Sequence, residues 1–272
     1  MNDRVRLDVD GHVARVCLAR PEKRNALDLA MFEAIVAAAA DIAARDDVRA
    51  VVMHGDGPAF CAGLDLGAFF STPDAGSRLL GREDGAETNL AQEAAWCWRR
   101  LPVPVIAALH GEVFGGGLQI ALGADIRLIA PGARVSVMEI RWGLVPDMAG
   151  SRILPDLMRL DVAKELTLSG RIVDAPEAVS LGLATRICDE PLASAINLAE
   201  EIAARSPDAV RAAKFLLDEA PQMDHASGLA LETRLQMGLL GGRNQMEAAR
   251  AGMEKRAPVF RAATIDLKGM LE

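Results

Sequence analysis

The chain has 272 residues, of which 51% are hydrophobic, and its formal net charge is −8. This length suffices for one large domain, or for one domain with an additional region. The acidic balance argues against nucleic acid as the main partner. The high hydrophobic fraction suggests additional burial, such as a subunit interface.

No segment is typical of a targeting sequence or a membrane span. Charged residues interrupt the first ten positions, so we expect no secretory signal peptide. The longest apolar stretch, residues 26–44, contains Asp28, Glu33 and Asp41, which argues against a membrane span. The four cysteines lack metal-site spacing and fit a reducing cytosol. We therefore expect a cytoplasmic protein with no metal and no membrane partner.

The N-terminal part predicts short strands that alternate with helices. Residues 5–18 alternate apolar and polar side chains around Asp10-Gly11, which predicts two strands joined by a turn. Asp28 can cap a helix that runs to about Ala44. Residues 50–54 predict the next strand. This order of strand, strand, helix and strand indicates an α/β architecture.

A run of three glycines, residues 115–117, follows a predicted buried strand at 103–109. Glycines permit a sharp turn and let a ligand approach the backbone closely. A short helix ended by Gly123 follows them, and a further strand is expected at 134–137. The free N–H groups at the start of that helix suit an anion, or an oxygen that becomes one. A turn that serves packing alone is the alternative for an isolated glycine run.

Two further segments differ from this pattern. Residues 67–93 are rich in small and polar residues, which indicates either a mobile lid or a disordered insertion. The part after Pro207 predicts amphipathic helices without strands. It must therefore pack on the core or on a neighbouring subunit.

Five segments together resemble the crotonase (enoyl-CoA hydratase/isomerase) family, in that family's order and over nearly the whole chain. They are RPEKRNALD at 20–28, CAGLDL at 61–66, HGEVFGGGLQIALGADI at 110–126, MEIRWGLVPDMAGSRILP at 138–155 and KRAPVF at 255–260. The resemblance implies an α/β crotonase fold, a spiral of ββα units. Residues 1–205 would form the core for binding and catalysis, and residues 206–272 a helical region for oligomerisation. A homotrimer or hexamer is implied.

The resemblance also implies an acyl-CoA thioester substrate, with coenzyme A as part of the substrate and no separate cofactor. Two backbone N–H groups would stabilise the enolate oxygen, and losing one such donor typically costs a few kcal/mol. The resemblance places one donor at Gly116 and the other in the turn Ala62-Gly63-Leu64. We prefer Leu64, with Ala62 as the fallback. Asp65 would then be structural, accepting loop N–H groups.

Hydratases of this family hold the attacking water between two glutamates. The resemblance places these positions at Gln119 and Glu139. An amide can position water but cannot act as a base. One carboxylate of the hydratase pair is thus replaced, which disfavours a two-glutamate mechanism.

A second acid, Asp147, follows Glu139 at a spacing that resembles the dienoyl-CoA isomerases of the family. Carried over, Glu139 and Asp147 would pass a proton between two carbons, and two carboxyls with separated pKa values suit that. Alternatively, Asp147 caps a helix that begins near Met148, and Glu139 is a solvated carboxylate at a strand end.

The substrate-binding side chains are less sharply indicated. Basic residues suit phosphate oxygens, but each could equally be a solvated surface charge, which is the more common position of Lys and Arg. Trp142 and Phe69 could line an acyl pocket or pack in the core, whereas Trp96 and Trp98 are expected to pack on a helix. A catalytic Cys61 is disfavoured because no histidine partner is recognisable. The expected binding residues are Lys23, Arg24, Ala26, Ala62, Gly63, Asp65, Trp142 and Lys255, with Arg256 beside the last.

The sequence therefore predicts an acyl-CoA enzyme that favours (di)enoyl-CoA double-bond isomerisation by Glu139 and Asp147. Hydration by Glu139 with a water held by Gln119 is the alternative. A non-catalytic acyl-CoA-binding scaffold is a third hypothesis, and the pair of carboxyls argues against it.

Overall fold

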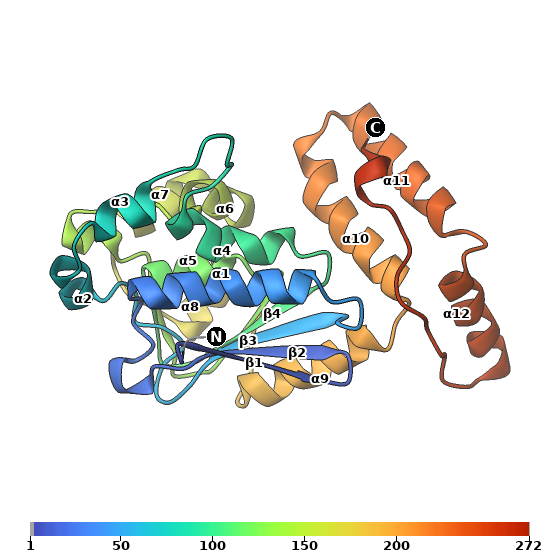
Figure 1. Ribbon diagram of the computed structural model, residues 1–272, viewed down its shortest axis with the longest axis horizontal. Coiled ribbons are helices and arrows are strands. Elements are labelled where there is room, and N and C mark those ends of the chain that lie inside the picture. Colours follow the sequence, from blue (N-terminus) through green and yellow to red (C-terminus); the bar gives the residue numbers. More distant parts are fainter. Residues whose placement is uncertain (1–2, 272) are drawn as a thin grey trace.

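The computed structural model describes residues 3–271 and consists of a β-sheet core covered by helices (Figure 1). The larger sheet has the strand order β1-β2-β3-β4-β6-β9, and a smaller sheet has the order β5-β7-β8. The strands are β1 (Val5–Asp10), β2 (Val13–Leu18), β3 (Ala50–Gly55), β4 (Val105–Leu109), β5 (Glu112–Phe114), β6 (Ile126–Ile129), β7 (Arg134–Ser136), β8 (Val173–Asp174) and β9 (Arg186–Ile187).

Helices connect and cover these strands. The α-helices are α1 (Leu29–Ala43), α2 (Leu66–Ser71), α3 (Ala75–Leu80), α4 (Leu90–Arg100), α5 (Gly116–Leu122), α6 (Gly150–Leu157), α7 (Leu160–Ser169), α8 (Ala175–Ser180), α9 (Pro191–Ala203), α10 (Pro207–Glu219), α11 (His225–Leu239) and α12 (Arg243–Glu254). Short 3-10 turns are η1 (Pro21–Lys23), η2 (Glu139–Trp142), η3 (Ala220–Gln222) and η4 (Lys268–Met270).

The larger sheet begins with an antiparallel hairpin and continues with parallel strands. β1 pairs with β2 from Val5 opposite Leu18, and the turn lies at the expected Asp10-Gly11. The later neighbours β3, β4, β6 and β9 are all parallel to the strand before them. Parallel strands need crossover connections, and helices provide them here. The predicted strand at 103–109 is shorter than expected, because β4 begins at Val105.

Two apolar layers cover the sheet. Figure 1 shows α1, α4 and α5 on one side and α9 on the other. The Asp28 side chain accepts from the Met31 N–H and caps α1, as predicted. Every residue of α5 is buried. The glycine turn before α5 therefore lies inside the molecule, where a helix start can face an enclosed ligand.

The segment 67–93 contains α2, α3 and the start of α4, so the expectation of a disordered insertion is wrong for this part of the chain. A capping box begins α4, in which the Asn89 side chain accepts from Gln92 N and the Gln92 side chain accepts from Asn89 N. Side chains of α2 and α3, such as Phe69 and Leu79, face a cavity. Whether the segment moves as a lid stays a prediction.

The C-terminal helices α10 to α12 lie to the side of the core, at the opposite end of the molecule from α2 and α3 (Figure 1). They have their own small apolar cluster around Leu231 and Leu235. Ser206 caps α10, which coincides with the expected start of this region, and the division into two domains remains a prediction. The Asp208 carboxylate accepts from Thr264 N at 2.6 Å and holds the C-terminal segment against α10. None of the helices within residues 3–271 is long and apolar enough to cross a membrane.

Candidate active site

A cavity of about 240 Å³ lies where α1, α2, α3 and α4 meet the start of α5 and the loop after η2. It is the place where most of the expected chemistry comes together. Its walls include both expected N–H donor residues, Leu64 and Gly116, and both expected acids, Glu139 and Asp147.

Two loops run side by side at the floor of this cavity. Cys61 forms a parallel bridge with Val113, and Phe114 N donates to Cys61 O at 3.0 Å. Gly63 has φ +90°, and a Cβ added there would lie 2.9 Å from Phe114 O and 3.9 Å from the Gly115 Cα. The absence of a side chain at Gly63 therefore lets the two turns touch.

Each expected donor follows a glycine with positive φ. Gly63 precedes Leu64, and Gly115, with φ +51°, precedes Gly116 at the first position of α5. Within residues 3–271, the N–H groups of Leu64 and Gly116 have no hydrogen-bond acceptor. The fallback position Ala62 is different, because its N–H donates to Arg24 O at 3.0 Å. The structure thus rules out Ala62 as a free donor.

Asn25 is an anchor of this floor that the sequence analysis did not recognise. It is completely buried, and its amide donates to Asp56 O and Ala59 O while accepting from Arg20 N. Asn25 also has a left-handed backbone, with φ 56°. Asparagine tolerates that conformation better than most residues, so the asparagine in RPEKRNALD was the available signal.

Arg20 is a second anchor that was missed. Its buried guanidinium lies 2.9 Å from the Asp65 carboxylate and donates to Ala26 O. Asp65 also accepts from Ala68 N and caps α2, and that backbone hydrogen bond, with Arg20, holds the pKa of Asp65 below its usual value. These contacts agree with the structural role expected of Asp65. They fix the turn that presents Leu64.

Glu139 is buried, with only 8% of its surface exposed, so the alternative of a solvated carboxylate is wrong. The pairing of β7 with β5 carries the chain to this point, and a Cβ on Gly115 would lie 3.4 Å from Glu139 Oε1. Oε1 accepts from Gln119 Nε2 at 2.6 Å. Oε2 is buried and has no partner in the described part of the chain. Burial raises the pKa of Glu139 above its ordinary value of 4.5.

The Gln119 amide is occupied by protein contacts. Its Oε1 accepts from Met148 N at 2.9 Å and from Gly150 N at 3.0 Å, while its Nε2 donates to Glu139. Between these two N–H groups, Ala149 has a left-handed backbone with φ 67°, which is strained for a residue with a side chain. Gln119 therefore links Glu139 to the loop that carries Asp147.

Asp147 lies at the solvent side of the cavity. The helix after it, α6, begins at Gly150 and has Ala149 at its N-cap, so the interpretation of Asp147 as a helix cap is wrong. Partial burial raises the pKa of Asp147 above 3.8, and its charge raises the pKa of Glu139 in turn. The two carboxyls line the same cavity, close enough for the charge of Asp147 to act on Glu139.

The other expected binding residues are distributed unevenly. Phe69 and Trp142 line the cavity, and Trp142 is 61% exposed at its edge. Lys23 and Arg24 are exposed on the loop that also carries Ala26, beside the donor turn. Lys255 is the C-cap of α12, which lies at the opposite end of the molecule from α2, so the chain does not bring its own Lys255 to the cavity (Figure 1). Trp96 and Trp98 lie on α4 as predicted, and Trp98 is fully buried.

Cys61 lies beneath the floor as a structural residue. Its thiol is fully buried, and it donates to Asn25 O at 3.0 Å. Burial raises the pKa of Cys61 to about 12, so the reactive thiolate is scarce near neutral pH. No group of three or more His, Cys, Asp or Glu residues within residues 3–271 could hold a metal ion.

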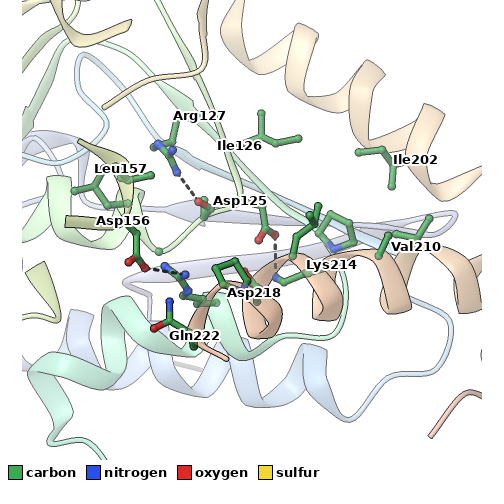
Figure 2. A pocket seen from close by; sticks show the side chains of 18 residues that line it. Asp125, Ile126, Arg127, Asp156, Leu157, Ile202, Val210, Lys214, Asp218 and Gln222 are labelled. Atoms are coloured by element: carbon green, nitrogen blue, oxygen red, sulfur yellow. Dashed lines mark hydrogen bonds and ion pairs between the residues drawn. The ribbon is translucent and has the colours of Figure 1, made fainter. Parts of the chain in front are cut away.

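A larger cavity, about 670 Å³, lies between the core and α10 (Figure 2). Figure 2 shows Lys214 pointing from α10 to Asp125, with a separation of 2.9 Å. Arg99 pairs with Asp156 at 3.1 Å, and Arg127 donates to Ala124 O and Leu183 O. None of the expected site residues lines this groove.

The spiral of strands, the glycine turn before the buried α5 and the helical C-terminal region define a protein of the crotonase fold. A sequence model of the enoyl-CoA hydratase/isomerase family matches residues 8–263, so the chain belongs to that family.

Known relatives agree with this assignment. The chain is 33% identical over 253 residues to the enoyl-CoA hydratase EchA19 of Mycobacterium tuberculosis, covering 92% of this chain and 93% of the relative. It is 29% identical over 245 residues to the mouse mitochondrial methylglutaconyl-CoA hydratase, covering 88% and 76%. The crystal structure of an enoyl-CoA hydratase from Bacillus anthracis superposes with a TM-score of 0.87 at 30% identity, covering 94% and 98%.

Proposed function

We propose that this protein moves a double bond in an enoyl- or dienoyl-CoA thioester, with Glu139 as the principal base and Asp147 as the partner acid. One observation carries the proposal. Glu139 Oε2 is buried and unpartnered, although buried polar atoms in proteins nearly always have a partner. A group left in that state beside an enclosed cavity is suited to take a proton from a bound ligand.

The proposed reaction begins with the thioester carbonyl oxygen between the N–H groups of Leu64 and Gly116. Ionised Glu139 removes a proton from carbon, and the electron pair of that C–H bond moves through the conjugated system onto the thioester oxygen. The two fixed donors stabilise the negative charge on the resulting enolate oxygen. The form of the pair that reacts is the one in which Glu139 is ionised and Asp147 carries the proton, and Asp147 then delivers that proton to a different carbon. Glu139 ends protonated and Asp147 ionised, and proton exchange with water resets both.

Gln119 supports this reaction as a positioning residue. Its carbonyl oxygen already accepts two N–H groups and its amide already donates to Glu139. It also lies outside the cavity walls. A water held by Gln119 therefore finds less support than an acid pair held in place by it.

Hydration is the second candidate, and the names of relatives favour it. EchA19 and the Bacillus anthracis protein are both called enoyl-CoA hydratases. In that reaction, the water oxygen would add to the β-carbon as its proton passes to Glu139, and Glu139 would then return this proton to the α-carbon of the enolate, with Asp147 orienting the water. A purely binding scaffold finds little support, because ionisable groups with raised pKa values in a cleft are typical of chemistry.

Coenzyme A would be part of the substrate, with no separate cofactor. Lys23 and Arg24 are exposed beside the donor turn and suit its phosphates. We further propose a homotrimer or hexamer in a cytoplasmic setting. Exposed apolar side chains on α10 to α12, such as Leu217, Met237 and Met253, suit burial between subunits. A second chain is also the proposed route by which Lys255 reaches a CoA phosphate.

A substrate panel in D2O tests the reaction. Enoyl-, dienoyl- and 3-hydroxyacyl-CoA thioesters are incubated with the enzyme, and products are separated by mass and by double-bond position. Isomerisation yields a shifted double bond with no added mass beyond exchanged deuterium. Addition of D2O yields a hydroxyacyl product. Hydroxyacyl product alone would overturn isomerisation, and no turnover of any thioester would overturn both candidates.

A further inference from the structure

We infer that the cavity beside Glu139 selects uncharged, apolar acyl chains of up to about eight carbons and rejects chains that end in a carboxylate. Leu80 and Ala91 are the residues that set this preference. The inference rests on the proposed function, since it concerns the acyl chain of the same thioester.

The charges that face the cavity all have one sign. Glu139 and Asp147 are the ionisable residues among its walls within residues 3–271, and both are acids. Arg78, the basic residue of α3, is not among the cavity walls and pairs with Glu33 at 2.7 Å. An acyl carboxylate in this cavity would therefore lose its hydration without gaining a counter-charge, and it would meet two carboxyls.

The remaining walls are apolar, and four helices contribute to them. Phe32 of α1, Phe69 of α2, Leu79 of α3 and Ala91 of α4 enclose the space, and Phe32, Leu79 and Ala91 are buried. An apolar chain is favoured here because each buried methylene contributes about fourfold in binding.

The volume limits the length of the chain. At ~30 Å³ for each water-sized group, a cavity of about 240 Å³ holds roughly eight of them. A methylene group is of similar size. The thioester carbonyl and the two carbons that react occupy part of the space, which leaves room for roughly five further carbons.

Leu80 and Ala91 occupy different positions in this wall. Leu80 ends α3 at the mouth and is 53% exposed, so a longer or charged side chain fits there without disturbing the core. Ala91 lies in the first turn of α4 and is 3% exposed. A larger residue at Ala91 would fill space that the acyl chain uses.

The experiment measures kcat/KM for 2-enoyl-CoA thioesters of four, six, eight and twelve carbons, and for glutaconyl-CoA, whose acyl chain ends in a carboxylate. Dissociation constants of the unreactive thioesters hexanoyl-CoA and glutaryl-CoA are measured in parallel. We expect values that rise from four carbons to six or eight and fall at twelve. We also expect at least a hundredfold preference for the six-carbon substrate over glutaconyl-CoA.

Three variants assign the preference to residues. Leu80→Lys should raise the glutaconyl-to-hexenoyl ratio at least tenfold by supplying a cation, and the uncharged control Leu80→Gln should not. Ala91→Leu should move the preferred length to four carbons. If Ala91→Leu does not fold, the comparison of Leu80→Lys with Leu80→Gln and the chain-length series of the parent still test the inference.

The outcomes separate this inference from the proposed function. Turnover of glutaconyl-CoA as good as that of hexenoyl-CoA would overturn the inference while leaving the proposed chemistry intact. If no thioester is turned over, the proposed chemistry fails, and the dissociation constants of hexanoyl-CoA and glutaryl-CoA then test the inference on acyl-chain selection. Glutaryl-CoA bound as tightly as hexanoyl-CoA would then overturn the inference, and preferential binding of hexanoyl-CoA would support it.

Discussion

Two hollows of the molecule differ in how their charged groups are paired. In the groove between the core and α10, Lys214 lies against Asp125, and Arg99 against Asp156 (Figure 2). In the smaller cavity at the start of α5, Glu139 keeps one carboxylate oxygen without any partner in the described residues. An ion pair in the larger hollow joins α10 to the core, and the smaller hollow contains the carboxyl that we propose as the base.

The difference shows that size alone is a poor guide to a site. The Lys214–Asp125 ion pair joins α10 to the core, and removing one partner would leave the other charge without its counter-charge. Arg211 Nε, on α10 itself, is the other buried side-chain polar atom without a partner in the part of the chain that the structure describes. A guanidinium nitrogen is a hydrogen-bond donor and takes up no proton, whereas the carboxylate oxygen of Glu139 can, and Glu139 shares its cavity with both expected N–H donor residues and a second acid, Asp147.

The largest expected effect comes from Glu139→Gln. The new amide can still accept the hydrogen bond from Gln119, but it cannot take a proton. We expect kcat to fall about 10²–10⁴-fold, with a much smaller change in the dissociation constant of an unreactive acyl-CoA. Single-turnover kinetics and calorimetric titration measure the two quantities. Parent-like turnover would show that the unpartnered oxygen has no chemical role.

A smaller loss of activity is expected from Gln119→Met, which removes the contacts that join Glu139 to the loop at Met148 and Gly150. We expect kcat to fall about 10–100-fold, and stability by about 1–3 kcal/mol because two N–H groups lose their acceptor. Loss of the Gln119 hydrogen bond should also raise the pKa of Glu139 further. The acid limb of the pH–kcat/KM profile should then move to higher pH. An unchanged profile would reduce Gln119 to a packing role.

A substitution in the groove between the core and α10 should lower stability and leave activity nearly unchanged. Lys214→Met leaves Asp125 without its cation and removes donors to Trp98 O and Val103 O. We expect a loss of about 1–3 kcal/mol in urea denaturation, since Asp125 is partly exposed, and a kcat within about twofold of the parent. The exposed Lys164→Met on α7 is the matched control. A large loss of kcat in folded Lys214→Met would contradict the division of roles.

How much of this could be predicted from the sequence depends on what each residue does. The hairpin at 5–18, the Asp28 cap and the glycine turn were accessible, because local periodicity and capping chemistry determine them. The closeness of Glu139 to Gly115 was reached through the family resemblance alone. It depends on the pairing of β5 with β7, which is not local.

Other features could not be predicted from local signals. The Gln119 contacts join residues 29 and 31 positions apart, through a strained turn at Ala149 that no sequence pattern announces. Asn25 and Arg20 look like ordinary loop residues, yet both are buried in the fold. The helices of residues 67–93 could not be recognised, because small polar residues are frequent both at helix caps and in disordered segments.

The pH dependence of stability offers a smaller effect. The pKa of Glu139 is raised in the folded state, so its contribution to stability is fully present below about pH 4.5 and is lost as pH rises through the raised value. Above that range the ionised group opposes folding. Glu139→Gln should therefore be more stable than the parent at pH 7–8, and the gain should shrink towards pH 4. Thermal melting of both proteins across this pH range measures the gain in stability. A gain that grows towards low pH would contradict a raised pKa of Glu139 in the folded state.

The smallest effect is expected at Cys61. Its buried thiol has a pKa of about 12, so an excess of iodoacetamide at pH 8 should leave it unmodified and activity nearly unchanged. Cys188, which is partly exposed, is the internal control for the reagent. Peptide mass mapping distinguishes the two cysteines. Rapid inactivation that follows alkylation of Cys61 would restore the hypothesis of a catalytic thiol.

The most direct test of the account uses butyryl-CoA in D2O. This saturated thioester can neither add water nor shift a double bond, so exchange of its α-protons reports proton removal next to a stabilised thioester oxygen. The account predicts enzyme-dependent exchange that slows at least about 10²-fold in Glu139→Gln and persists in Lys164→Met. Exchange that is equally fast without the Glu139 carboxylate would contradict the assignment of the unpartnered oxygen as the base.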